Sequence, residues 1–517
     1  MKKWLLYLSP YAFFLLFRIP TFFDPYYYVD NGIYAAIGEG LNHGLILYKN
    51  LYDNKTPGIY YLYALLERLH IDLNFLVQSL SIVAGIISLY LIFKITKKLF
   101  SNELFSYISS FIFAFLIGST VFAGNLSNVE NFILPFALYS VYLILNNKEN
   151  LYPFIIYLAG LILGIGFLFK FTIIFDGGFL CIAFLFLYGF IKFIKYSIIY
   201  VLGLITPIGI FLIWELMIHN FYTAFSAMFL GNIGYVGNDT AGYRYVIINF
   251  IALIVSLGIL FFLYKRKYIY ENITLIFLWF TFEYFGTLFS GRPYLHYLIL
   301  VSSSLSILFA YVVLIPYRIK FIARLSIFAI FCVLLYFMGL YFFRTENIGQ
   351  VKSQFVKNYT YYSNFLSFAF GYIDRSQYFS TSYFQYNTNV AYEKHSISSD
   401  VIYKISSSIL SVYNVKDKPI LIWGNFPWMY YITGSYPAAK LVADFASPYP
   451  PSSFNTLNFN TIKSVNPVII VTYSDGYNFP NLFHYIAKYY IYRKSFDGAN
   501  IYISKNLVYS HAFSSKG

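Results

Sequence analysis

The chain has 517 residues, of which 59% are hydrophobic and only 11% are charged. Soluble globular domains carry roughly 25% charged residues, so this composition excludes an ordinary soluble protein and predicts a polytopic membrane protein. The formal net charge is +14, but lysine and arginine cluster between apolar runs, which favours a topology signal over a nucleic-acid partner. We therefore expect the lipid bilayer to surround much of the chain, and no nucleic acid as a partner.

Apolar runs long enough to span a membrane recur along the first two thirds of the chain. A spanning helix needs about 20 apolar residues. The eleven candidate runs cover residues 4–23, 75–97, 103–122, 129–146, 152–169, 171–190, 195–218, 243–264, 271–289, 294–314 and 320–343. The break at Lys170 is the least secure boundary, because residues 152–190 also allow other divisions. The sequence predicts an α-helical membrane protein with about eleven transmembrane helices.

The basic residues predict the orientation of these helices. If the N-terminus is cytoplasmic, every inner connection is basic: Lys94, Lys97 and Lys98; Lys148; Lys192 and Lys195; Lys265, Arg266 and Lys267; Arg318, Lys320 and Arg324. The opposite connections hold few lysines or arginines, as the positive-inside rule expects. We predict a multi-pass protein of the cell membrane, with everything after about residue 345 outside the cytoplasm.

The composition changes after residue 344. The sequence predicts a transmembrane domain over 1–344 and an extracytoplasmic, mixed α/β domain over 345–517, a normal domain size. Helices are expected over 400–412 and 480–489. Short strands are expected at 420–424, 440–445 and 468–473, and Asp497-Gly498 predicts a β-hairpin between the last two β-like runs.

The first outer loop, 24–74, is the most polar segment of the first third of the chain. It carries Asp30, Asp53 and Lys55, and its segment 56–70 is expected to form a helix at the membrane interface. A carboxylate such as Asp30 can accept a proton from a hydroxyl or bind a divalent cation. The alternative is that Asp30 only N-caps the helix-like stretch after it. For Asp53 and Lys55 the alternative is a local ion pair at a turn.

Other ionisable residues fall on the same predicted side. Glu130 begins the fourth apolar run, Lys170 lies between two runs, and Arg292 and His296 are four positions apart near 290–296. Glu130 also suits a helix N-terminus, and Lys170 can extend to the interface as a snorkelling residue. Arginine can bind phosphate through two hydrogen bonds, whereas a lone histidine is more often structural. Their convergence on one side predicts an active site facing out of the membrane.

These residues carry a resemblance to a known family. After Asp30 and Tyr34, the first outer loop contains the pattern G-x-x-L-Y-x-x-x-x-D-x-K-x-P-G. Its residues here are Gly44, Leu47, Tyr48, Asp53, Lys55, Pro57 and Gly58. This pattern resembles the GT-C glycosyltransferases of the protein O-mannosyltransferase and lipid A aminoarabinose transferase group. The turn RPYLHY at 292–297 and the stretch IWGNFPWMYYITGSYPAAK resemble further parts of these proteins. Asn31 and Thr56 depart from the pattern of many members and leave metal use and the acceptor type open.

The resemblance implies a GT-C fold that transfers a sugar from a polyprenyl-phosphate donor to a protein, lipid or glycan acceptor, with inversion. Carried over to this chain, Asp30 is the catalytic base, and Lys55, Lys170 and Arg292 bind the donor phosphate. Asp53, Glu130, Tyr48 and His296 have supporting roles, and a divalent metal ion held by Asp30 and Glu130 stays an open alternative.

Two other functions are alternatives to transfer. A lipid-linked sugar transporter or flippase would show internal repeats and charges in the middle of spans. We find no repeat, and the candidate charges lie at the outer ends. A non-catalytic membrane anchor would leave the charges of the first loop unexplained.

Overall fold

The computed structural model describes residues 3–231, 240–267, 269–289, 294–314, 348–390, 393–443, 452–473, 480–496 and 498–507. Its contacts group the chain into two units. Unit 1 holds Met1–Phe22, Gln78–Ile218 and Tyr235–Asn358, and unit 2 holds Phe23–Val77, His219–Gly234 and Tyr359–Gly517. The first outer loop therefore belongs to the same unit as the C-terminal part of the chain. The boundary predicted between 344 and 345 lies outside the described residues, as do Arg292 and the predicted span 320–343.

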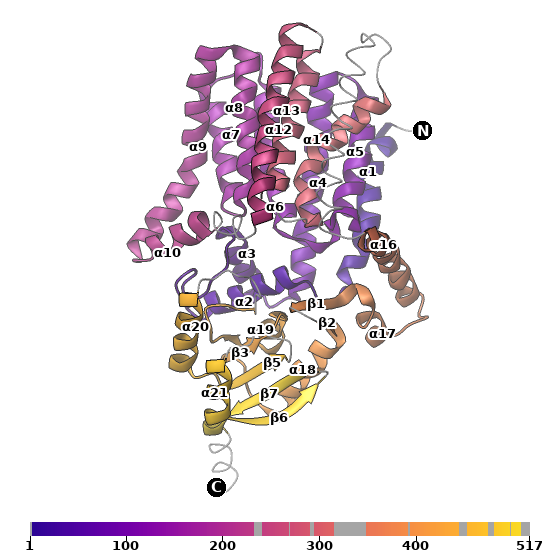
Figure 1. The fold of residues 1–517 in the computed structure, drawn as a ribbon. Helices are drawn as coiled ribbons and strands as arrows, with labels where there is room; N and C mark the ends of the chain where they lie inside the picture. The colour runs from indigo at the N-terminus through magenta and orange to yellow at the C-terminus, as the bar shows by residue number, and fades with distance from the viewer. Residues whose placement is uncertain are drawn as a thin grey trace. The chain divides into compact units, whose positions relative to one another are not determined.

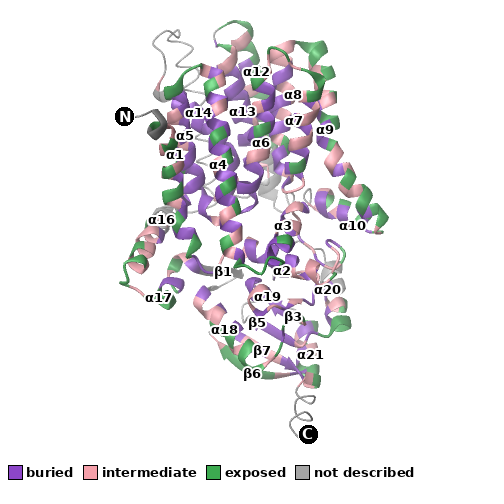
Figure 2. Ribbon diagram, turned by 180° about the vertical axis from the view of Figure 1, so that it is seen from behind, coloured by how far each residue is buried: buried purple, intermediate pink, exposed green. Residues whose placement is uncertain are grey.

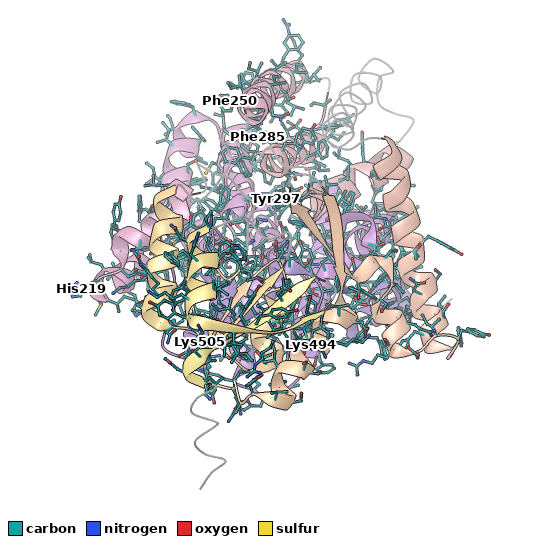
Figure 3. The ribbon with its side chains drawn as sticks, turned by 60° about the horizontal axis from the view of Figure 1, so that its bottom comes forward. His219, Phe250, Phe285, Tyr297, Lys494 and Lys505 are labelled. Carbon is teal, nitrogen blue, oxygen red and sulfur yellow. The ribbon has the colours of Figure 1, made fainter. Side chains whose placement is uncertain are left out.

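Unit 1 is a helical bundle (Figure 1). Its helices are α1 (Lys3–Arg18), α4 (Leu73–Phe100, whose first turn lies in unit 2), α5 (Glu103–Gly118), α6 (Val129–Asn146), α7 (Pro153–Phe167), α8 (Ile174–Tyr188), α9 (Phe190–Met217), α12 (Thr240–Lys265), α13 (Glu271–Leu288) and α14 (Leu298–Val313). Helix α7 packs against α6 and α9, and α13 packs against α8, α12 and α14. Phe250 of α12 and Phe285 of α13 bring their ring centroids within 6.1 Å of each other (Figure 3).

The described part of the chain contains five helices that are long and apolar enough to cross a membrane, in the segments Leu73–Phe100, Val129–Asn146, Phe171–Tyr188, Phe190–Met217 and Ile247–Lys265. Shorter apolar helices occupy several of the other predicted runs, such as Glu103–Gly118 and Pro153–Phe167. The predicted break at Lys170 is present between α7 and α8. Figure 2 shows α6 largely buried, whereas α9 and α12 expose much of their apolar surface. This exposure fits helices that face lipid.

A buried arginine ties the end of α1 to its neighbours within unit 1. The Arg18 guanidinium donates to Oε1 of Gln78 at 2.8 Å, to Oγ of Ser81 at 3.0 Å and to Oγ of Ser127 at 2.7 Å, and it also contacts the carbonyl of Gly124. Its five N–H donors suit this junction of several acceptors. The junction fixes the turn that leads into α6.

Unit 2 contains the first loop and the C-terminal α/β region. Its helices are α2 (Val29–Asn42), α3 (Gly58–Glu67), α10 (Phe221–Phe225), α17 (Arg375–Phe379), α18 (Ser399–Val412), α19 (Trp428–Thr433), α20 (Ser452–Val465) and α21 (Pro480–Tyr489), and α16 (Ile348–Ala369) enters it from unit 1. Its strands are β1 (Gln385–Val390), β2 (Glu393–Ser398), β3 (Pro419–Trp423), β4 (Tyr436–Pro437), β5 (Ile469–Tyr473), β6 (Tyr490–Phe496) and β7 (Ala499–Ser504).

The larger sheet has the order β4-β3-β5-β7-β6. Strand β3 pairs in parallel with β4 and β5, and β7 pairs antiparallel with β5 and β6. Leu421 and Ile470 pack with Ile462 of α20 and with Leu482 and Ile486 of α21. These two helices therefore cover one apolar face of the sheet.

The predicted hairpin and the helices at 400–412 and 480–489 are confirmed by β6–β7, α18 and α21. Gly498 has φ +88°, which a side chain would disfavour in this turn. The strand predicted over 440–445 is wrong for its described residues, where only Leu441 forms an isolated bridge, to Tyr52. The amide of Lys440 donates to the Asn458 side chain at 2.8 Å, and that of Leu441 donates to it at 3.2 Å. These bonds use the donors that a strand would need.

Helices α2 and α3 pack side by side and run in the same direction. Tyr34 contacts Tyr60 near their beginnings, and Asn42 donates to the carbonyl of Ala64 near their ends. The loop between them therefore returns the chain to the end of the pair where α2 starts. This return brings Lys55, just before α3, close to the first turn of α2.

Candidate active site

Lys55 lies between two carboxylates in unit 2. Its Nζ is 3.6 Å from Oδ2 of Asp30 and 3.4 Å from Oδ2 of Asp53. It also lies 5.2 Å from the ring centroid of Tyr34. We call Asp30, Asp53 and Lys55 the Lys55 centre. The sequence predicted these three residues as candidates, and the structure brings them together.

Asp53 is the more firmly held carboxylate of the centre. Its Oδ1 accepts from the amide of Asn54 at 2.8 Å, and its Oδ2 accepts from the hydroxyl of Tyr60 at 2.8 Å. Tyr60 is buried, and burial, followed by the charge of Asp53, holds the pKa of its hydroxyl well above the usual range. The hydroxyl therefore keeps its proton and donates a hydrogen bond to Asp53. This bond holds the Asp53 carboxylate in position beside the Lys55 ammonium.

Tyr48 fixes the backbone at Lys55. It is fully buried, has φ +65°, and donates its hydroxyl to the carbonyl of Lys55 at 2.8 Å. A non-glycine residue with positive φ is uncommon and costs energy that surrounding contacts must offset. Tyr48 therefore holds the main chain of Lys55 in place.

Asp30 lies in the first turn of α2, and the alternative that it caps this helix is wrong. The N-cap is Tyr28, because the helix begins at Val29. The indole of Trp428 donates to the Tyr28 carbonyl at 2.8 Å and holds this end of the helix. The Asp30 side chain remains 25% exposed, compared with 8% for Asp53. Of the two carboxylates, Asp30 is the more exposed.

A second group of predicted residues meets in unit 1. The Lys170 ammonium forms a close ion pair with Oε1 of Glu130, and Nε2 of His296 lies 3.8 Å from the same oxygen. Lys170 Nζ is also 4.2 Å from the ring centroid of Tyr297, which is labelled in Figure 3. We call Glu130, Lys170 and His296 the Glu130 centre.

The local sequence explains how the Glu130 centre forms. Asn128 caps α6 by accepting from the amide of Val129, so Glu130 stands in the first turn, where a negative charge is favourable. Lys170 occupies the extended break before α8. Glu130 is fully buried and Lys170 is 6% exposed. A buried charge needs a partner, and here each supplies the other.

The described residues give limited support for a metal ion. They contain no group of three or more histidine, cysteine, aspartate or glutamate side chains suited to a metal. Asp30 and Glu130 each have a lysine ammonium beside them. A metal ion held by Asp30 and Glu130 stays a prediction, and we derive no step through a metal.

Two further acids occur at the far end of the α2–α3 pair. Burial raises the pKa of Glu39 to about 7. Burial, and then the neighbouring Glu39, raise the pKa of Glu67 to about 10, and Asn42 donates to Glu67 at 3.1 Å. The Nε2 atom of His43 lies 3.1 Å from Oδ1 of Asp417. These contacts join the first loop to the C-terminal region within unit 2.

Sequence reasoning missed a pair of acids inside the helices of unit 1. Asp176 of α8 and Glu283 of α13 are both buried, and their helices pack against each other. The indole of Trp279 donates to Asp176 at 2.9 Å, and the amide of Ser304 donates to Glu283 at 3.1 Å. Acidic residues within apolar runs were the available signal.

Comparison with known families supports the predicted resemblance. Residues 54–214 match the model of the dolichyl-phosphate-mannose-protein mannosyltransferase family. The matched segment includes Lys55, Glu130 and Lys170 and begins after Asp30. A comparison with curated proteins gives no match. The family match confirms the resemblance and indicates a membrane glycosyltransferase of the GT-C type.

Proposed function

We propose that this protein transfers a monosaccharide from a polyprenyl-phosphate donor to an acceptor hydroxyl, with inversion at the anomeric carbon. The observation that carries the proposal is the Lys55 centre, in which a reachable carboxylate and a buried carboxylate share one lysine ammonium. A base and a cation placed side by side suit a reaction that releases a proton from one reactant and a phosphate from the other.

In the proposed step, Asp30 takes the proton of the acceptor hydroxyl. The hydroxyl oxygen forms a bond to the anomeric carbon while the bond between that carbon and the phosphate oxygen breaks. The leaving polyprenyl phosphate keeps the electron pair of the broken bond. The Lys55 ammonium stabilises the negative charge that develops on it, as a point charge of fixed position.

The support for this assignment is positional. Asp53, which accepts from Tyr60, contacts the ammonium from the buried side, so Lys55 does not depend on Asp30 alone for its place. We also propose that Lys170 and Arg292 bind the donor phosphate. Glu130 then sets the position of Lys170 through their buried ion pair.

A donor panel tests the proposal. The purified protein in lipid vesicles is incubated with labelled polyprenyl-phosphate sugars and with peptide, lipid and glycan acceptor fractions. Transfer predicts free polyprenyl phosphate together with a labelled acceptor, in a ratio of one to one. Passage of intact donor across the bilayer without cleavage would contradict transfer and support a transporter.

A further inference from the structure

A pocket lined by lysines lies at the end of unit 1 that the charge pattern predicts to be cytoplasmic. Its volume is about 500 Å³, and its lining includes Lys94, Lys97 and Lys98 of α4, Lys148 and Glu149 after α6, and Asn272 of α13. Neither candidate centre contributes a residue to this lining. Pockets of roughly 300–1,000 Å³ are typical of small-ligand sites.

The lysines of the pocket differ in their partners. Lys97 pairs with Glu103 at 2.9 Å, and Lys148 pairs with Glu271 at 2.8 Å. Among the residues that the structure describes, no carboxylate lies within ion-pair distance of Lys94 or Lys98. The single acid of the lining is Glu149, against four lysines. The pocket therefore carries an excess of positive charge.

Lys94 and Lys98 are one helical turn apart on α4, and both are half-buried. Like charges at positions i and i+4 repel each other. An anion between them would relieve that repulsion, and a phosphate offers several acceptor oxygens to lysine ammonium groups. Basic pockets between helices on the cytoplasmic side of membrane proteins bind the headgroups of anionic lipids.

A simpler account assigns these lysines only to topology and to the α4 C-terminus. Lys97 and Lys98 do lie in the last turn of α4, where a positive charge is favourable. That account does not require Lys94, which lies before the last turn, or Lys148, from a separate segment, to face the same cavity. The convergence of two segments on one concave space is the observation that favours a ligand.

We propose that this lysine pocket binds a phosphate-bearing anion, carried by a lipid headgroup or free in solution. The proposal is independent of the glycosyl transfer proposed above, because it uses other residues and a different readout.

The test compares two double variants with the same change in charge. Lys94→Gln/Lys98→Gln removes two charges from the pocket. Lys192→Gln/Lys195→Gln removes two exposed charges of α9, which also belong to a predicted cytoplasmic connection. Native mass spectrometry measures phosphatidylglycerol retained by the full chain after extraction from phosphatidylcholine vesicles with and without that lipid. A second arm titrates inorganic phosphate and measures its binding and its competition with the lipid.

We expect the pocket variant to bind phosphatidylglycerol about 30-fold more weakly than the wild type, which corresponds to about 2 kcal/mol at about 1.4 kcal/mol per tenfold. The α9 variant should retain the lipid. Competition by inorganic phosphate would show that the free anion also enters, and no competition would assign the pocket to the lipid headgroup. Equal losses in both variants, or no bound anion in the wild type, would overturn the proposal. If the double variant does not fold, Lys98→Gln against Lys195→Gln repeats the comparison.

Discussion

At the residue scale, polar side chains in an apolar chain were the useful signal. Asp30, Asp53 and Lys55 stood out in the sequence, and the structure joins them around one ammonium. Tyr60 was not predicted, because its contact with Asp53 depends on the path of the chain into α3. Asp176 and Glu283 were missed because each is a single acid in a long apolar run, and the packing of α8 against α13 that buries both is not visible in the sequence.

The Glu130–Lys170 ion pair should be strongly coupled. Glu130→Gln or Lys170→Met alone leaves a buried charge without its partner, a change that typically costs about 3–5 kcal/mol. The double variant Glu130→Gln/Lys170→Met should lose less thermal stability than the sum of the two single variants. Thermal unfolding of the purified wild type, the two single variants and the double variant measures this double-mutant cycle. The exposed pair Lys97 and Glu103 is the control, and changes there should leave the melting midpoint unchanged. Additive losses at Glu130 and Lys170 would contradict the pairing.

Glu67 should make the protein less stable as the pH rises. Its pKa is raised from 4.5 to about 10, so the folded state holds a proton that the unfolded state releases between these values. Glu67 therefore does not lower the free energy of unfolding below about pH 4.5, and it lowers this free energy progressively as the pH rises toward about 10. Glu67→Gln should therefore stabilise the protein by about 1–3 kcal/mol near pH 8, with little effect near pH 4. Melting midpoints against pH measure this, with the exposed Glu149→Gln as control. A Glu67→Gln variant with the pH dependence of the wild type would refute it.

At the element scale, most helices could be predicted from apolar runs and turn signals, but packing partners could not. The helix-like stretch after Asp30 is present as α2, although it starts before Asp30. The strand expected at 440–445 failed because a side chain far along the sequence, Asn458, binds its amides. Trp428 contacts the start of α2 across 400 sequence positions, and no local sequence pattern predicts such a contact.

Gly32 should be intolerant of a side chain. A Cβ at this position would lie 2.8 Å from Cδ1 of Trp428 and 3.0 Å from Cγ of Pro427, so α19 or the first turn of α2 would have to move. We expect Gly32→Ala to destabilise the protein by about 1–3 kcal/mol, and to slow transfer because Asp30 shares that turn. Gly258→Ala is the matched control, since a Cβ there meets nothing within 4 Å. Thermal unfolding and turnover are measured for both variants, and equal behaviour would contradict the close packing of α2 against α19.

At the scale of the whole molecule, composition predicted a helical membrane protein, and the β-like runs after residue 344 predicted its α/β part. The grouping of Phe23–Val77 with Tyr359–Gly517 could not be predicted, because these segments are separated by most of the chain. Their union rests on side chains such as Asp24, which is buried and accepts from Tyr361 at 2.9 Å and from Tyr378 at 3.2 Å. The sequence had suggested no functional role for this aspartate.

The predicted orientation in the membrane can be tested by cysteine labelling. In a Cys181→Ser/Cys332→Ser background, the exposed positions Ser101 and Ser464 are changed to cysteine one at a time. The basic inner connections predict that an impermeant maleimide labels Ser464→Cys on intact cells and labels Ser101→Cys only after permeabilisation. The reverse labelling pattern would contradict the predicted topology and would place the loop that carries the Lys55 centre on the cytoplasmic side of the membrane.

The central claim is that Asp30 accepts the proton of the acceptor hydroxyl, and one comparison tests it most directly. Asp30→Asn removes the base and keeps nearly the same shape, while Asp72→Asn makes the same change at an exposed position of the same loop. Single-turnover transfer from the polyprenyl-phosphate sugar identified by the donor panel is measured for both variants, after their melting midpoints show intact folding. The account predicts a fall of about 10²–10⁴-fold for Asp30→Asn and a wild-type rate for Asp72→Asn. Transfer by folded Asp30→Asn at the wild-type rate would contradict it.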